Sequence, residues 1–151
     1  LAKGLGGGFP IGVCLATEAA AAGITPGTHG STFGGNPLAA AVGNAVLDVL
    51  LEDGFLARAR GMGKLLFAHM VRLGETYADI IDDVRGAGLM IGVKCVPPVG
   101  DMISACREAG LLTVPAGENV MRLLPPLVID ESHVKEAAKM VEAACEAVAA
   151  K

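Results

Sequence analysis

The sequence has few aromatic side chains, which make up 3% of its 151 residues and include no tryptophan. Hydrophobic residues nevertheless account for 52% of the chain, and they are mainly alanine, valine, leucine, isoleucine and methionine, beside 21 glycines. Small and branched aliphatic side chains of this kind suit helices packed tightly on sheets. We therefore expect a chain of mixed α/β structure that is long enough to bury a real core.

Other absences argue against several kinds of partner. The formal net charge is −4, and the 12 lysines and arginines are scattered without a basic stripe, which argues against a nucleic-acid partner. Three dispersed histidines, and cysteines that form no CxxC pair, argue against a metal site. No apolar run reaches the roughly 18 residues of a membrane-spanning helix, so we expect no membrane partner.

The four cysteines, Cys14, Cys95, Cys106 and Cys145, are far apart in the sequence. No signal peptide is apparent, and an alanine-rich chain with a full core does not need disulfides for stability. We expect all four to be small buried hydrophobic residues in a protein of the reducing cytoplasm.

The mean hydropathy of +0.54 is high for a free-standing domain of this size. One explanation is an alanine-rich core helix in the stretch "NPLAAAVGNAVLDVLL", which Asn44 and Asp48 interrupt. The other is that part of the surface is covered, either by a partner or by sequence upstream of Leu1.

The first half of the sequence predicts one strand, one long loop and two long helices. The apolar run at 10–17 indicates a buried strand, and a short helix or turn follows it at 17–24. Residues 25–37 lack periodicity and are rich in Gly, Thr and Pro, as in a functional loop. Asn36 and Pro37 are suited to begin a helix that stops near Gly54, and a second helix is expected at 55–74.

The second half predicts a small α+β arrangement with helices on one face of a sheet. A domain boundary is expected near residues 75–83. Asp101 is the expected N-cap of the first of two helices and Asp130 that of the second. The expected order is strand, helix, strand, strand and helix, at residues 88–95, 100–110, 111–115, 119–126 and 130–151.

Lys3, in "AKGLGGG", is the first candidate functional residue. A phosphate loop of the Walker type places its lysine after the glycines, and a dinucleotide-binding loop follows a strand, so neither pattern fits. A flat cofactor could approach the bare glycine backbone beside the Lys3 amine. The alternative is an ordinary exposed lysine in a glycine turn.

Two further stretches carry candidate binding residues. Ser31 and Thr32 offer hydroxyl groups in a loop that leads into a helix N-terminus, a place that favours a phosphate; an ordinary capped turn is the alternative. Arg122 lies within the apolar pattern of "ENVMRLLPPLVI" and could bind a substrate carboxylate. An intramolecular ion pair would explain it equally well.

Four stretches in this order, "LAKGLGGGFPIG", "HGSTFGGNPLA", "VRGAGLMIGV" and "MRLLPPL", resemble the class III (ornithine-type) aminotransferases. The resemblance implies the cofactor pyridoxal 5′-phosphate and transfer of an amino group to 2-oxoglutarate. N-acetylornithine is the implied amino donor, and ornithine, succinylornithine, succinyldiaminopimelate and 4-aminobutyrate are alternatives. From the residues alone, a non-catalytic α+β module that dimerises also stays open.

The resemblance also implies roles for single residues. Lys3 would bind the cofactor covalently and carry the proton during catalysis, and Arg122 would hold the α-carboxylate of glutamate or 2-oxoglutarate. Thr32 would donate to the phosphate of the neighbouring subunit's cofactor, and Ser31 would contribute to that neighbour's substrate pocket. These roles imply a homodimer with shared active sites.

The fold implied is a fragment of a fold type I pyridoxal-phosphate transferase. Residues 1–50 would end the large cofactor domain, 51–78 would form a connecting helix, and 79–151 would form the small C-terminal domain. The family's groups that pair with the pyridine nitrogen and stack on the cofactor ring belong to a segment preceding the lysine, which is absent here. We therefore expect negligible activity from the 151 residues alone.

Overall fold

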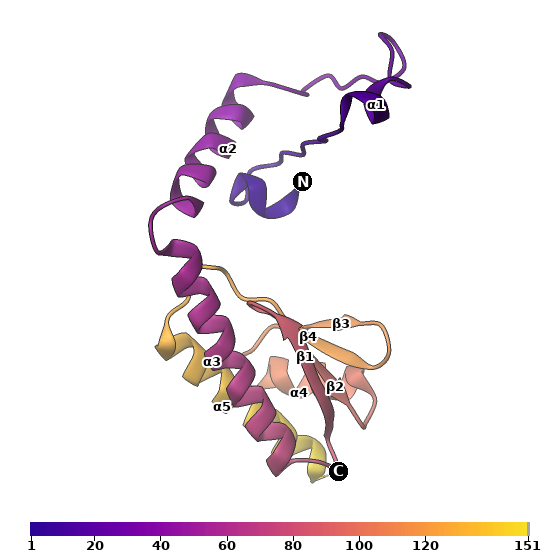
Figure 1. Cartoon of the computed structure of the whole chain (residues 1–151). Helices are drawn as coiled ribbons and strands as arrows, with labels where there is room; N and C mark the ends of the chain where they lie inside the picture. The colour runs from indigo at the N-terminus through magenta and orange to yellow at the C-terminus, as the bar shows by residue number, and fades with distance from the viewer. Residues whose placement is uncertain (151) are drawn as a thin grey trace. The chain divides into compact units, whose positions relative to one another are not determined.

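The structure is a computed structural model, and it describes residues 1–150. The chain divides into two compact units, the first at Leu1–Phe55 and the second from Leu56 onward (Figure 1). The three-part division at 1–50, 51–78 and 79–151 stays a prediction.

The first unit contains three helical segments: the 3-10 helix η1 (Lys3–Gly6), the short helix α1 (Glu18–Ala21) and the longer helix α2 (Pro37–Leu50). Asn36 caps α2 as predicted, because its Oδ1 accepts a hydrogen bond of 2.9 Å from the backbone N–H of Ala39. The helix ends before Gly54, which adopts a φ of 86°. The glycine segment after η1 packs on α2, since a Cβ at Gly7 would lie 3.1 Å from Cγ2 of Val46.

The strand predicted at residues 10–17 is wrong for this structure, which shows no regular element there. Sheet formation needs a neighbouring strand to receive the backbone hydrogen bonds. In the described part of the chain, the backbone groups of Leu1 and Val13 exchange bonds of 2.7 and 2.8 Å, and Thr17 at the end of the segment accepts bonds only from the helix that follows it. Most of the segment is exposed.

The second unit is a four-stranded antiparallel sheet with three helices. In sheet order, the strands are β1 (Ile81–Ala87), β2 (Met90–Cys95), β4 (Val120–Leu123) and β3 (Val114–Ala116). The helices are α3 (Phe55–Thr76), α4 (Val99–Glu108) and α5 (Glu131–Ala149). The predicted strands β2 and β4 are confirmed with shorter bounds, and β3 is found three residues later than predicted, at Val114–Ala116 instead of 111–115, whereas β1 was not predicted.

The core of this unit lies between one face of the sheet and the three helices (Figure 1). Ile91 and Val93 of β2 and Met121 of β4 are fully buried on that face. The predicted apolar stripe of α5 is confirmed, with every member buried: Val134, Ala138, Val141, Cys145 and Val148. The opposite face of the sheet carries the more polar side chains, so the expected arrangement with helices on one face is found.

Of the two helix caps predicted for this unit, one is confirmed and the other is wrong. Asp130 caps α5 as predicted: its Oδ1 accepts from the backbone N–H groups of Ser132 at 2.8 Å and His133 at 3.2 Å. The Ser132 hydroxyl also donates to this carboxylate, and these bonds hold the pKa of Asp130 well below its usual value. The prediction that Asp101 caps α4 is wrong, because that helix begins two residues earlier, after Pro98.

Among residues 1–150, no helix has both the length and the apolar character that crossing a membrane requires.

A close backbone contact joins α3 to the turn between β1 and β2. A Cβ at Gly63 would lie 2.4 Å from the carbonyl oxygen of Gly88, a distance no side chain tolerates. Gly63 is therefore the position at which the helix can approach the turn, which itself needs a glycine because Gly88 has a φ of 58°.

Replacing Gly63 with alanine should lower the free energy of unfolding by about 1–3 kcal/mol, because the helix and the turn must separate. Gly61 in the same helix provides the matched control, since nothing lies within 4 Å of a Cβ placed there. Gly61→Ala should raise stability by roughly 0.5–1 kcal/mol through helix propensity. Urea unfolding of both variants checks this, and equal effects would contradict the close contact.

Candidate functional site

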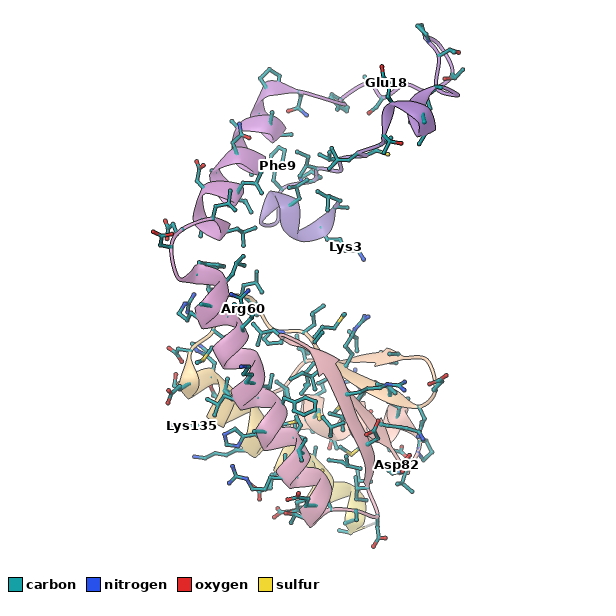
Figure 2. All side chains as sticks on the ribbon, viewed as in Figure 1. Lys3, Phe9, Glu18, Arg60, Asp82 and Lys135 are labelled. Atoms are coloured by element: carbon teal, nitrogen blue, oxygen red, sulfur yellow. The ribbon has the colours of Figure 1, made fainter. Side chains whose placement is uncertain are left out.

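Lys3 begins η1 with a backbone in the left-handed region, at a φ of 55°. Its side chain is exposed and extends away from the η1 turn (Figure 2). Within residues 1–150, the structure gives its amine no hydrogen bond and no ion pair. An open hollow of about 460 Å³ lies beside it, lined by Lys3, Gly4, Gly7, Gly8, Phe9, Pro10 and Ile11. The amine is thus free to react beside a bare glycine backbone.

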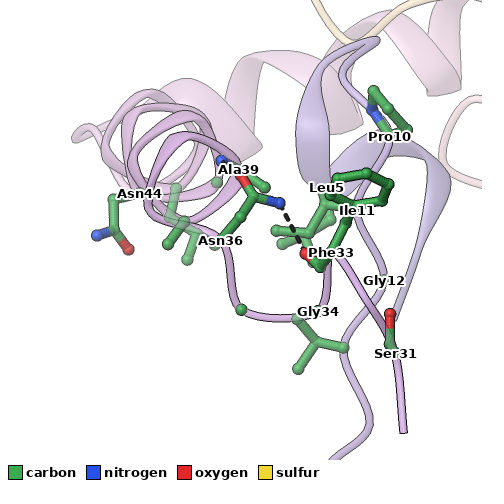
Figure 3. A pocket seen from close by; sticks show the side chains of 15 residues that line it. Leu5, Pro10, Ile11, Gly12, Ser31, Phe33, Gly34, Asn36, Ala39 and Asn44 are labelled. Atoms are coloured by element: carbon green, nitrogen blue, oxygen red, sulfur yellow. Dashed lines mark hydrogen bonds between the residues drawn. The ribbon is translucent and has the colours of Figure 1, made fainter.

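Ser31 lines a larger, mostly apolar pocket of about 480 Å³ in the same unit (Figure 3). The pocket lies between η1, the segment after it, the loop before α2 and α2 itself. Asn36 holds the loop at this point, because its Nδ2 donates to the carbonyl oxygen of Phe33 at 2.8 Å while its Oδ1 caps α2. The neighbouring Thr32 is exposed and is not among the lining residues.

Arg122 lies on the open face of the sheet in the second unit. It occupies β4 directly opposite Gly92 of β2, and Arg85 of β1 lies opposite the other side of Gly92. Because Gly92 has no side chain, both arginine side chains border a space above it. These residues help to line an open pocket of about 560 Å³.

The two arginines differ in their partners. Arg85 Nη2 donates to Glu118 Oε2 at 3.0 Å, and this pair is largely exposed. The hydrogen bond from Arg85 and its charge lower the pKa of Glu118. Arg122 is partly buried, its Nε is fully buried, and that atom has no hydrogen-bond partner in the described residues. The intramolecular ion pair considered for Arg122 is therefore not found.

An unpaired guanidinium nitrogen in a buried position is costly, because it has lost water without gaining an acceptor. Arg122 also lines the open pocket, and a guanidinium can bind a carboxylate in bidentate geometry. The arrangement at Arg122 thus suits a carboxylate ligand, and Gly92 leaves room for one.

The structure places the predicted residues in two groups. Lys3, Ser31 and Thr32 belong to the first unit, where Lys3 and Ser31 line two hollows that share Pro10 and Ile11. Arg122 belongs to the second unit. In residues 1–150, no group of three or more histidine, cysteine or acidic side chains is arranged to hold a metal ion.

Sequence reasoning missed the part played by Gly92. The residue opposite Arg122 follows from strand register, which needs β2 and β4 to be aligned correctly. The alternation of "MIGVKC" and "VMRL" contains this signal, because the buried residues of the two strands must share one face.

Comparison with known proteins places this chain in a family. The sequence profile described as Aminotransferase class-III matches residues 1–145. The chain is 52% identical over 151 residues to an acetylornithine aminotransferase of Agrobacterium fabrum, covering all of this chain and 38% of that protein. It is 50% identical over 149 residues to one of Mesorhizobium japonicum, covering 99% of this chain and 37% of that protein.

Solved structures agree with this relationship. An N-acetylornithine aminotransferase of Stenotrophomonas maltophilia superimposes with a TM-score of 0.82 and 36% identity, covering 97% of this chain and 39% of that chain. An ornithine aminotransferase of Plasmodium yoelii superimposes with a TM-score of 0.85 and 32% identity, covering 96% of this chain and 39% of that chain. The chain belongs to the class III aminotransferase family, and it spans less than two fifths of the length of these relatives.

Class III aminotransferases use pyridoxal 5′-phosphate. The residues present fit that group: the Lys3 amine is exposed and unpaired, and glycine backbone without Cβ atoms lies beside it.

The prediction that all four cysteines are buried is confirmed for three of them and wrong for Cys14. Cys95, Cys106 and Cys145 lie in the core of the second unit, but Cys14 is exposed because it lies in the segment without sheet partners. Burial raises the pKa of the Cys106 thiol to about 11 and that of Cys145 to about 12. Burial also raises the pKa of Cys95.

These thiols should differ in reactivity. At pH 8, iodoacetamide should modify Cys14 in the folded chain, and the three buried cysteines only after unfolding. Raised pKa values keep the buried thiols protonated far above neutral pH, and the thiolate is the form that reacts. Peptide mapping by mass spectrometry with and without urea checks this. Rapid labelling of Cys106 or Cys145 in the folded chain would contradict the described core.

Proposed function

We propose that this chain is the C-terminal part of a pyridoxal-phosphate-dependent acetylornithine aminotransferase. The reaction converts N2-acetylornithine and 2-oxoglutarate into N-acetylglutamate 5-semialdehyde and glutamate, a step of arginine biosynthesis in the cytoplasm. Identities of 46–52% to seven relatives named acetylornithine aminotransferase support this substrate. Ornithine aminotransferase structures resemble the chain at 32–35% identity, so ornithine is the second candidate donor.

The observation that carries the proposal is the partly buried Arg122, whose Nε has no partner. 2-Oxoglutarate and glutamate each have an α-carboxylate, and a guanidinium binds a carboxylate with two parallel hydrogen bonds. Gly92 leaves open the space in front of Arg122. Arg122 is thus the proposed residue that binds and orients the amino acceptor.

Lys3 is the proposed catalytic residue. When bound, the cofactor supplies an electron sink that stabilises negative charge at the reacting carbon of the substrate. The Lys3 amine would hold the cofactor covalently in the resting enzyme. Once released, Nζ would take the proton from the substrate carbon that bears the reacting amino group and pass it to C4′ of the cofactor, as a general base and then a general acid.

Ser31 and Thr32 are proposed to act across a dimer interface. Thr32 would donate its hydroxyl to the phosphate of the partner subunit's cofactor, and Ser31 would border that subunit's substrate pocket. Several large apolar side chains of the first unit are exposed, as expected if a second copy or other parts of the enzyme cover them. These are Leu1, Leu15, Ile24, Phe33, Leu38 and Leu51.

The domain assignment follows the same proposal. Residues 1–50 would complete the large cofactor domain of a fold type I enzyme, residues 51–78 would connect the domains, and residues 79–151 would form the small domain. The coverage of less than two fifths of each relative supports this assignment.

Lys3→Ala in the complete enzyme should lower kcat by at least about 10³-fold, because both the covalent bond and the proton carrier are lost. Lys64→Ala, at an exposed position of α3, is the control and should retain full activity. Borohydride reduction followed by peptide mapping should find the cofactor on Lys3. Full turnover by Lys3→Ala would contradict the assignment, as would measurable turnover by the isolated 151 residues.

Arg122→Gln should raise the KM for 2-oxoglutarate by about 10–100-fold, the effect of losing hydrogen bonds to a charged group. Arg107→Gln is the matched control, because that arginine is exposed on α4 and donates only to Ser104 Oγ, at 3.3 Å. Steady-state kinetics at fixed donor concentration measures both. An unchanged KM in Arg122→Gln would contradict the proposed role.

A further inference from the structure

Asn119 uses its whole side-chain amide to join separate parts of the second unit. Its Oδ1 accepts from the backbone N–H of Val99 at 2.8 Å. Its Nδ2 donates to the carbonyl oxygens of Cys95 at 2.6 Å and Pro97 at 2.8 Å. The side chain therefore caps α4 and at the same time binds the segment that connects β2 to α4.

The backbone of Asn119 contributes to the same attachment. Its carbonyl oxygen accepts from the N–H of Cys95 at 3.0 Å, so both backbone groups of Cys95 are bonded to this one residue. Its φ of 62° lies in the left-handed region, which asparagine adopts more readily than most residues. That conformation allows the backbone and the side chain to reach β2 together.

Strand β4 begins immediately after Asn119, and Arg122 lies three residues further on. In the observed register, Val120 pairs with Lys94, Met121 with Val93, and Arg122 with Gly92. Asn119 thus fixes the end of β4 against the end of β2.

The hydrophobic pattern fixes this register only in part. A slip of one residue would expose Met121 and bury Arg122, so the core excludes it. A slip of two residues keeps each side chain on its own face and moves Arg122 by roughly 6.6 Å along the sheet. The core pattern alone does not exclude that movement, whereas the bonds between Asn119 and Cys95 do.

We propose that Asn119 is a positioning residue, which holds Arg122 opposite Gly92 where its guanidinium can bind the carboxylate of the amino acceptor. The proposal rests on the function proposed above for Arg122. Asn119 itself lines neither the Arg122 pocket nor the hollow beside Lys3. Its effect on the reaction is through the placement of β4.

Asp130 provides a matched control, because its side chain also caps a helix of the second unit. Its Oδ1 accepts from the backbone N–H groups of Ser132 and His133 at the start of α5. Asp130 is not among the residues that line the Arg122 pocket. Asp130→Ala therefore removes a helix cap of the same unit and leaves the attachment of β4 to β2 in place.

The test compares Asn119→Gly, Asn119→Asp and Asp130→Ala in the complete enzyme. Glycine keeps the left-handed backbone and removes the amide. Aspartate keeps an acceptor for Val99 but replaces both donors with an oxygen that repels the two carbonyls. Each Asn119 variant should raise the KM for 2-oxoglutarate about tenfold, while the half-reaction with the amino donor changes by less than about twofold. Asp130→Ala should lower the melting temperature and leave both kinetic quantities unchanged.

Kinetics are measured below the melting temperature of each variant, and Asn119→Asp decides the test if the glycine variant does not fold. The proposal is overturned if the Asn119 variants lower only the melting temperature and leave the KM unchanged. An equal rise in KM for Asp130→Ala would also overturn it. If Arg122→Gln itself leaves the KM unchanged, the proposed function fails instead, so the two failures are distinguishable.

Discussion

The pairing of β2 with β4 in a single register is the constraint on which the second unit depends. It places Met121 and Leu123 against the helices and, between them, Arg122 on the open face opposite Gly92. Gly92 has to be small, since a Cβ there would lie 2.9 Å from Cγ1 of Val120. The alternation of side chains along β4 therefore builds the core on one face of the sheet and places the charged Arg122 beside the open pocket on the other.

The charges on the open face follow from this arrangement. Lys94 pairs with Asp82 at 2.5 Å, and Arg85 pairs with Glu118. Both pairs are exposed, and solvent screens them, so they add little to stability. Arg122 differs because it is partly buried and no acidic side chain of the described residues pairs with it. An external carboxylate is the partner that we propose for it.

Local signals in the sequence were sufficient to predict the N-caps of α2 and α5. Asn36 and Asp130 cap the helices they precede, since both caps are made within three residues of the chain. The cap of α4 could not be predicted in this way: Val99 is capped by Asn119, which lies 20 residues further along the chain. The prediction that Asp101 caps α4 relied on the preference of aspartate for N-cap positions. In the structure, a contact with a residue distant in the sequence caps this helix instead.

Strands were harder to predict, because they depend on neighbours. Strand β1 was missed because "IDDVRGA" is polar and only Ile81 in it is buried. The run at 10–17 has a strand-like composition, but it has no strand beside it in residues 1–150. Lys3 and Arg122 were found from their residue types and surroundings in the sequence. The unpaired state of Arg122 depends on register and burial, which only the structure supplies.

The central claim is that Arg122 is a receptor for a substrate carboxylate. A crystal structure of the complete enzyme with a bound dicarboxylate such as 2-oxoglutarate tests it most directly. The account predicts two carboxylate oxygens within hydrogen-bond distance of the Arg122 guanidinium, roughly 2.7–2.9 Å, above Gly92. A ligand bound elsewhere, with Arg122 paired to an acidic side chain of the protein, would contradict it.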